Sequence, residues 1–435
     1  MQQKIQQLYN KSVSLKKGKK HRVLSLFSGC GGMDLGFEGG FIVHRQSVNE
    51  ILHPDFIKKQ LPDDFVQLKE TSFQTVFSND ILPEARTAWV KHFNKLGYDA
   101  ASICHSDSVV DLVKSHHANE DVFPIDIDIV TGGFPCQDFS VAGKRMGFDS
   151  GKDHTGKRRT DDEPTEETRG KLYFWMKQVI DIVKPKIFIA ENVKGLTNLG
   201  DVKDIIRNDF SSADGNGYIV LNPKVLHAAD YGVPQSRERV IFIGIRKDSL
   251  TERALHALLQ EDVPEEYNPY PPITHNYHVK DEKLKPFQTV RNVFAQLKEP
   301  DESKDLSQMK YSHAKYMGKH CQGQTEVNLD DIGPTIRSEH HGNIEFRRLL
   351  AEHGGKYADE LSKGLQERRL TPRECAMIQT FPPDYEFVFE RSQSFPMSVS
   401  ASGAYKIIGN AVPPMLAYNI ARRIESLWDL YFGEL

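Results

Sequence analysis

Short apolar runs, each followed by a polar turn and a helical stretch, alternate along the chain up to Arg246. The predicted strands cover residues 23–27, 75–78, 102–105, 126–134 and 186–190. Strands that alternate with helices predict a doubly wound, mostly parallel α/β sheet of the Rossmann-like kind. Ligands of such sheets bind at the carboxyl ends of the strands. The polar residues that follow each predicted strand are therefore the first candidates for a functional site.

Composition indicates an ordinary soluble protein of more than one domain. The chain has 435 residues, of which 39% are hydrophobic and 27% charged, and its formal net charge is −4. No apolar run is long enough to cross a membrane, and the N-terminus lacks the apolar core of a signal peptide. We therefore expect a cytoplasmic protein without a membrane partner. The five cysteines are scattered and never closely paired, which predicts reduced thiols, no disulfide and no bound metal.

Changes in composition divide the chain into four predicted segments. Residues 1–22 carry seven lysine or arginine residues and no acidic one, which suits phosphate contact but is slightly more typical of a solvated tail. Residues 23–268 hold the strand-helix alternation. Prolines between 264 and 272 mark a linker, so a second, smaller domain is expected over 269–400, with residues 401–435 returning to the first domain. Residues 41–73 and 149–169 interrupt the pattern as insertions, the latter charged and expected to be a surface loop.

A cysteine stands directly after one predicted strand. Pro135, Cys136 and Gln137 follow the run 126–134, which ends in two glycines and a phenylalanine. A tight loop above a strand exposes a thiol and stabilises its thiolate, as a nucleophile requires. The alternative is a buried structural cysteine, but a flanking proline and preceding glycines form a rigid loop and a poor core. The sequence therefore predicts that Cys136 is a catalytic nucleophile.

The first predicted strand runs into a glycine-rich turn over residues 28–32 and then into a helix. This arrangement presents backbone amides to a cofactor. A dinucleotide fingerprint needs a third glycine where Asp34 stands, so a nicotinamide site is disfavoured. Asp80 follows the strand 75–78, where a ribose diol is held. Glu50 is a competing candidate, but a helical stretch follows Asp80 immediately, so Asp80 is preferred.

Six short motifs occur in one order, at residues 27–32, 133–137, 191–193, 230–239, 369–375 and 409–414. In type and order they resemble the motifs of the DNA (cytosine-5)-methyltransferase family of bacterial restriction-modification type. The resemblance implies S-adenosylmethionine as cofactor and double-stranded DNA as partner. It further implies a catalytic, cofactor-binding domain at 23–268 and a target-recognition domain at 269–400. A monomer that shields DNA from a cognate restriction endonuclease is the expected setting.

The resemblance also implies a role for each matching residue. The catalytic residues would be Cys136, Glu191, Arg237 and Arg239. The cofactor would be bound by Phe27, Ser28, Gly29, Cys30, Gly31, Gly32, Asp80, Asp107, Ser108, Pro135, Leu172, Asn410 and Val412. DNA would be contacted by Gln137, Ser140, Thr335, Arg337, His340, His341 and Asn343.

The chemistry of cytosine explains why the family needs these residue types. Carbon 5 becomes nucleophilic only after a thiolate, here that of Cys136, has added to carbon 6. Glu191 with a raised pKa would share a proton with ring nitrogen 3, and Arg239 would stabilise charge on the carbonyl oxygen. A stacked base is out of reach, so the resemblance implies base flipping.

Two alternatives remain at this point. Some relatives methylate tRNA with the same motifs, but a second domain of roughly one hundred residues favours sequence reading on duplex DNA. A non-catalytic DNA-binding relative usually lacks the nucleophile, whereas Cys136 and Glu191 are both present here.

Overall fold

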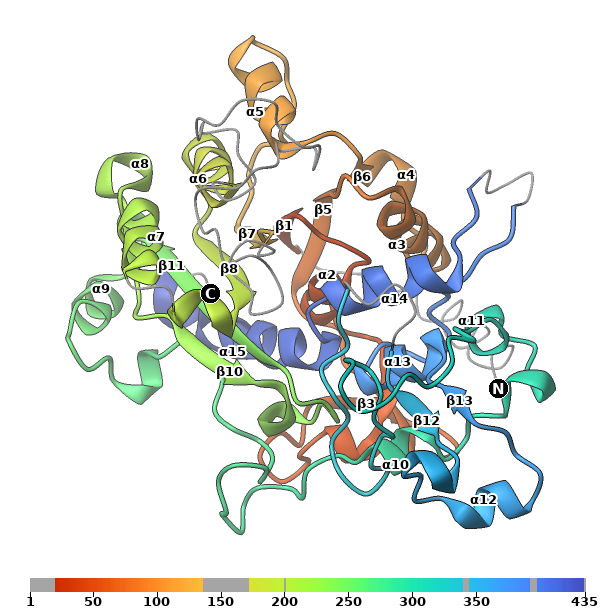
Figure 1. Cartoon of the computed structure of the whole chain (residues 1–435). Coiled ribbons are helices and arrows are strands. Elements are labelled where there is room, and N and C mark those ends of the chain that lie inside the picture. The colour runs from red at the N-terminus through yellow and green to blue at the C-terminus, as the bar shows by residue number, and fades with distance from the viewer. Residues whose placement is uncertain (1–19, 136–171, 199–200, 339–343, 392–396, 434–435) are drawn as a thin grey trace.

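The molecule is built on one large twisted sheet (Figure 1). The computed structural model describes residues 20–135, 172–198, 201–338, 344–391 and 397–433. The strand order is β10 (Lys224–His227), β11 (Glu238–Arg246), β8 (Ile187–Val193), β7 (Ile129–Gly133), β1 (His21–Leu26), β5 (Phe73–Asn79) and β6 (Cys104–His105), with β9 (Tyr218–Val220) paired to β11. Strand β11 is antiparallel to its neighbours, and the strands from β8 to β6 are parallel. The predicted fold class, a mostly parallel α/β sheet, is confirmed.

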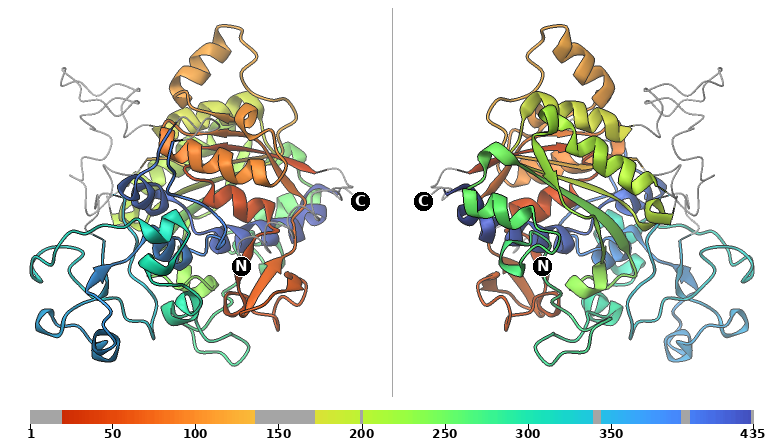
Figure 2. Two further views of the ribbon diagram at one scale, coloured as in Figure 1. Left: turned by 90° about the vertical axis from the view of Figure 1, so that its right-hand side faces the viewer. Right: turned by 90° about the vertical axis from the view of Figure 1, so that its left-hand side faces the viewer.

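Alternate residues of the central strands feed two separate apolar cores. In β8, Ile187 and Ile189 face one core, whereas Phe188 and Ala190 face the other. Because side chains of a strand point alternately to its two faces, one continuous apolar run serves both. The first core is covered by α2 (Gly32–Glu38), α3 (Pro83–Lys95), α14 (Ala401–Asn410) and α15 (Pro414–Phe432), and the second by α5 (Val109–His117), α6 (Leu172–Val183) and α7 (Val202–Ser211). Figure 2 shows the sheet between these layers.

The insertion at 41–73 forms a small sheet of its own. Its strands are β2 (Ile42–His44), β4 (Phe65–Leu68) and β3 (Ile57–Gln60), all antiparallel. Phe41 and Phe56 meet the ring of Tyr418 edge-on, with centroids 5.8 and 5.1 Å apart, so the small sheet rests on α15. The second insertion, 149–169, lies outside the described residues.

One predicted strand, 102–105, is confirmed only in its second half. Residues 100–103 form the short helix α4 (Ala100–Ile103), and only Cys104 and His105 are extended. The carbonyls of Ala101 and Cys104 both accept hydrogen bonds from the guanidinium of Arg86 on α3. These contacts with a neighbouring helix hold a turn where the local apolar pattern had favoured a strand.

Past β11 the regular elements become short. Those that follow it are α9 (Glu252–Leu258), α10 (Val290–Phe294), α11 (Leu306–Met309), β12 (Phe346–Arg348), α12 (Ala358–Ser362), β13 (Arg368–Arg369) and α13 (Pro372–Ile378). The similarly short helix α8 (Ala213–Asn216) lies before β11. Buried arginines tie this region together: Arg368 bridges Glu299 and Glu374, each contact being 2.8 Å. Such fully paired charges hold loops in one arrangement where little apolar surface is available. We retain the division at 269–400 as a proposal.

The last two helices lie against the first half of the chain. A Cβ atom added at Gly36 of α2 would come within 2.3 Å of the Cβ of Ala417 on α15, so the two helices cross in direct backbone contact. Gly36 is therefore required by packing. Within the described parts of the chain, no helix is long and apolar enough to cross a membrane.

Candidate active site

The glycine-rich turn after β1 is held by hydrogen bonds to the end of β5. Phe27, Gly29 and Gly31 have φ angles of 50°, 56° and 81°, which turn the chain sharply into α2. The hydroxyl of Ser28 donates to the carbonyl of Asn79 at 2.9 Å, and the amide of Asn79 donates back to that hydroxyl at 2.9 Å. A Cβ at Gly29 would have nothing within 4 Å, so open space lies over the turn.

Two neighbours of the turn are fixed by packing. A Cβ at Gly32 would approach the carbonyl oxygen of Val412 to 2.1 Å, so the turn and the segment after α14 are in close contact. The thiol of Cys30 donates to the carbonyl of Ile407 at 3.3 Å, and burial raises the pKa of Cys30 far above its ordinary value. The side chain of Cys30 is therefore fixed in the packing between the turn and α14.

Asp80 stands where β5 ends and faces the glycine turn. Its Oδ2 accepts from the amide of Gly29 at 2.9 Å, and its Oδ1 accepts from the amide of Leu82 at 2.8 Å. Burial raises the pKa of Asp80, opposed by these two amides and by Lys406. Glu50 instead forms a bidentate surface pair with Arg45, at 2.7 and 3.1 Å. Asp80 is thus the acid that the fold brings to the carboxyl edge of the sheet.

The next strand end places a further acid at this edge. Asp107 is exposed between β6 and α5, and its carbonyl accepts from the side-chain amide of Asn79 at 2.6 Å. Ser108 is buried and caps α5 through its hydroxyl, which accepts from the amide of Val110 at 3.3 Å. Within the described parts of the chain the carboxylate of Asp107 has no hydrogen-bond partner, while Ser108 sets the direction of the helix.

Glu191 and Arg239 form a buried ion pair at the ends of β8 and β11. The Arg239 Nε atom lies 2.5 Å from the Glu191 Oε1 atom, and the two side chains are 10% and 9% exposed. Burial raises the pKa of Glu191 above its ordinary value, although Arg239 and Arg237 oppose the shift. A carboxyl group that is easily protonated and a guanidinium that is always charged therefore stand side by side.

The end of β7 lies beside this ion pair, and the chain continues from there toward Cys136. Gly133 lies opposite Glu191 in the register of β7 and β8. The carbonyl of Phe134 accepts from the side-chain amide of Asn192 at 3.2 Å, which fixes the chain just before Pro135. Asn192 was assigned no role from the sequence. Its position directly after Glu191 was the one feature of the sequence that could have indicated this contact. Cys136, Gln137 and Ser140 lie outside the described residues.

Gly133 gives a direct test of the position of the Glu191 carboxylate. A Cβ at Gly133 would stand 2.8 Å from Glu191 Oε2, so Gly133→Ala is expected to displace the carboxylate and to lower kcat by about 10- to 100-fold. Gly132→Ala is the matched control, since its Cβ would meet the flexible Met176 side chain at 2.9 Å. Single-turnover methylation by the two variants, with thermal unfolding to check the fold, decides between them. Equal methylation rates in Gly133→Ala and Gly132→Ala would contradict a catalytic role for the Glu191 carboxylate at this position.

Arg237 points away from this pair and is 1% exposed. Its guanidinium donates to the carbonyls of Ile336, Gly409 and Ala411 at 3.1, 2.8 and 2.8 Å. The family resemblance implied a catalytic role for Arg237, whereas these three hydrogen bonds join it to two segments that are far away in sequence.

The remaining predicted residues lie around the same edge. Leu172 is buried at the start of α6, Asn410 is exposed at the end of α14, and Val412 follows it. Thr335 donates to the carbonyl of Ser236, and Gly333 exchanges backbone hydrogen bonds with Pro234 and Ser236 at 2.8 Å. Arg337 is half-buried and its backbone lies against Gly409. His340, His341 and Asn343 fall outside the described residues.

Comparison with known proteins agrees with this arrangement. The family model described as C-5 cytosine-specific DNA methylase matches residues 65–426. The chain is 31% identical to the Type II methyltransferase M.BsuRI of Bacillus subtilis, over 95% of this chain and 81% of that relative. It is also 31% identical to the Type II methyltransferase M.BspRI of Lysinibacillus sphaericus, over 94% of this chain and 82% of that relative.

The fold has a solved counterpart. The structure of the Entamoeba histolytica methyltransferase EhMeth superposes with a TM-score of 0.53 at 15% identity, and the match covers 95% of this chain and 99% of that one. At so low an identity the likeness bears on the fold alone. The family match and the coverage of both bacterial relatives show that the chain belongs to the C-5 cytosine-specific DNA methylase family and is a DNA cytosine-5 methyltransferase.

Proposed function

We propose that this enzyme methylates carbon 5 of a flipped-out cytosine within a short duplex sequence, through a covalent adduct with Cys136, and so protects DNA from a partner nuclease. The observation that carries the proposal is the buried Glu191–Arg239 pair beside the end of β7. The next residues of the chain from that strand end are Phe134, Pro135 and Cys136. The partner nuclease is proposed from the restriction-modification setting of the relatives. The family resemblance further suggests that the enzyme acts as a monomer.

The glycine turn and the neighbouring acids fit S-adenosylmethionine. The open space over Gly29 leaves room for the methionine portion, and the lone pairs of Asp80 that do not bind amides suit the ribose hydroxyls. The exposed carboxylate of Asp107 suits the adenine amine. Phe27, Pro135, Leu172, Asn410 and Val412 complete the proposed pocket. The cofactor supplies an electrophilic methyl group on a sulfonium.

In the proposed reaction, the Cys136 thiolate bonds to carbon 6 and pushes electrons onto ring nitrogen 3 and the carbonyl oxygen. Glu191 shares its proton with nitrogen 3, and Arg239 stabilises the charge on oxygen. Carbon 5 then takes the methyl group as the methyl–sulfur bond breaks. A general base accepts the carbon-5 proton, nitrogen 3 returns its proton to Glu191, and the Cys136–carbon 6 bond breaks to release the thiolate. The base reaches these groups only after it has left the stacked duplex, where its carbon 5 is inaccessible. Closure of the site around the flipped base then excludes water.

Arg237 fits a positioning role better than a contact with substrate. Its three carbonyl partners lie on the Thr335 segment and on the segment that touches the glycine turn. It therefore couples the proposed DNA-reading stretch to the cofactor pocket. Thr335 and Arg337, with Gln137, Ser140, His340, His341 and Asn343, remain the proposed DNA contacts, with Arg337 suited to guanine.

Asp80 and Glu50 give opposite expectations for cofactor binding. Asp80→Ala is expected to weaken S-adenosylmethionine binding by about 1–3 kcal/mol, because ribose hydroxyls and the Gly29 amide lose their acceptor. Asp80→Asn keeps one acceptor oxygen, so its affinity for S-adenosylmethionine is expected to lie between those of the wild type and Asp80→Ala. Glu50→Ala removes a surface pair and is the matched control. Titration calorimetry in which Glu50→Ala carried the loss would reverse the assignment.

Substrate class is tested by transfer of labelled methyl groups to duplex DNA and to tRNA in parallel. The proposal expects label in DNA only, at one short sequence that bisulfite sequencing of DNA from expressing cells identifies. Label in tRNA alone would replace the DNA substrate by the tRNA alternative, and label in neither would favour a non-catalytic relative.

A further inference from the structure

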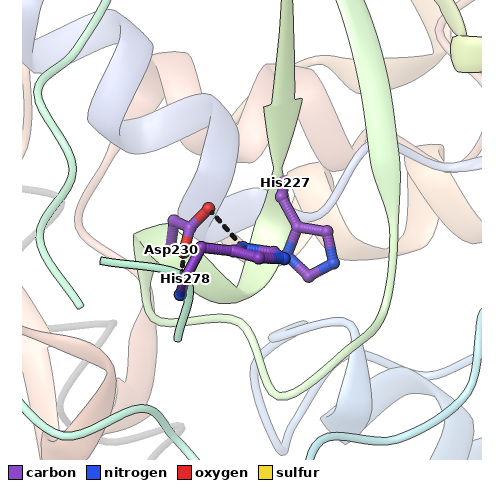
Figure 3. Close-up of side chains that lie close together, drawn as sticks. All are labelled: His227, Asp230 and His278. Carbon is purple, nitrogen blue, oxygen red and sulfur yellow. Dashed lines mark hydrogen bonds and ion pairs between the residues drawn. The ribbon is translucent and has the colours of Figure 1, made fainter. Parts of the chain in front are cut away.

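Two histidines and an aspartate form a cluster where β10 ends (Figure 3). His227 ends β10, Asp230 belongs to the short turn Ala228–Tyr231, and His278 comes from the segment after the linker. One ligand atom from each of the three residues lies within 4.8 Å of the other two. Figure 3 shows the three side chains converging from two stretches of chain, His227 and Asp230 from one and His278 from the other.

The donor atoms are arranged for a shared ligand. His278 Nδ1 lies 3.0 Å from Asp230 Oδ2, and the rings of His227 and His278 stand nearly perpendicular at 4.4 Å. In a tetrahedral zinc site with bonds of about 2.0–2.2 Å, neighbouring donors stand about 3.4 Å apart. Small side-chain rotations therefore bring the donors from their present spacing to coordination distance.

Burial makes His227 a ready ligand. Its Nδ1 atom is buried and has no hydrogen-bond partner within the described parts of the chain. Tyr277 stacks on the His227 ring with an interplanar angle of 1°, which fixes its plane. A His–Asp hydrogen bond alone accounts for His278 and Asp230 but leaves the Nδ1 atom of His227 without a hydrogen-bond partner among the described residues.

We propose that His227, Asp230 and His278 form a binding site for a divalent transition-metal ion, with zinc as the ion that suits two imidazoles and a carboxylate. Asp230 is 8% exposed and His278 is 53% exposed in their side chains, so the fourth position opens to solvent and takes water. The expectation of no bound metal considered cysteine spacing only, and these three ligands include no cysteine.

Bound zinc would tie two parts of the enzyme together. Thr274 and His275 already donate backbone hydrogen bonds to the Asp230 carbonyl at 2.9 and 3.0 Å. The imidazole of His275 also contacts the carbonyl of Gln46 at 2.8 Å, in the turn that follows β2 of the insertion. A metal at His278 would extend this anchoring to the exposed chain around Lys280 and Lys283.

Zinc affinity is the direct test, measured on full-length, tag-free protein stripped with a chelator. Competition with a chromogenic chelator is expected to show one zinc per chain in the wild type, and His278→Ala is expected to weaken binding by about 10-fold or more. His256→Ala, on the exposed face of α9, is the control that removes a histidine elsewhere. Both variants should keep the wild-type circular dichroism, because both side chains are exposed.

Two further readouts separate this site from binding at thiols. Cobalt in place of zinc is expected to show d–d bands without a thiolate charge-transfer band, and Cys136→Ser should bind zinc as the wild type does. Zinc should also slow tryptic cleavage after Lys280 and Lys283 in the wild type but not in His278→Ala. Unchanged affinity in His278→Ala, or a thiolate band, would overturn the proposal without touching the assignment of methyl transfer.

Discussion

Cys136→Ser is expected to lower the rate of methyl transfer by a factor on the order of 10⁴ or more, as loss of a catalytic nucleophile does. A serine hydroxyl is hardly ionised at neutral pH, so the bond to carbon 6 does not form. Binding of S-adenosylmethionine and of DNA should stay close to that of the wild type. Single-turnover assays and cofactor titration measure the two effects separately.

Cys321→Ser is the control for this substitution, because Cys321 is partly exposed and lies in the second half of the chain. It should keep the wild-type rate. Duplex DNA that contains 5-fluorocytosine should be trapped covalently by the wild type and by Cys321→Ser but not by Cys136→Ser. A wild-type enzyme that methylates normal DNA and never forms the trapped complex would remove Cys136 from the reaction.

Local patterns predicted the sheet because burial is a local property of these strands. The run 187–190 is apolar at every position and lies between two cores, so its sequence alone reveals a central strand. The acids Asp80 and Glu191 follow such runs, and the fold brings both to the strand ends. Only the second half of the strand expected at 102–105 forms, because contacts from Arg86, on another helix, hold the residues before it in a helical turn.

Long-range contacts explain what the sequence left undetermined. Arg237 and Arg239 share an alternating pattern, yet one binds Glu191 and the other binds carbonyls that lie 99, 172 and 174 positions away. Nothing in the spacing of the two arginines distinguishes them. The cluster at His227 and His278 was missed for the same reason, since those residues meet only through the chain that follows the linker.

Glu191→Gln is expected to lower the single-turnover methylation rate by about 10²- to 10⁴-fold, the usual contribution of a positioned proton donor. Glutamine keeps the size and hydrogen-bonding shape of the side chain but has no proton to transfer. Burial raises the pKa of Glu191, so the protonated acid persists to higher pH than in an ordinary glutamate. The contribution of Glu191 is therefore present below its folded pKa and is lost as the pH rises through that value.

The pH profile separates proton donation from a structural role. In the wild type the rate should fall on the alkaline side as Glu191 loses its proton, whereas Glu191→Gln should lack that dependence. Glu238→Gln, one residue before Arg239 and paired with Lys194 at 2.7 Å on the surface, is the matched control and should keep the wild-type profile. Thermal unfolding must accompany these rates, because Arg239 stays buried without its partner in Glu191→Gln. A folded Glu191→Gln enzyme with the wild-type rate and profile would show that the proton comes from another group.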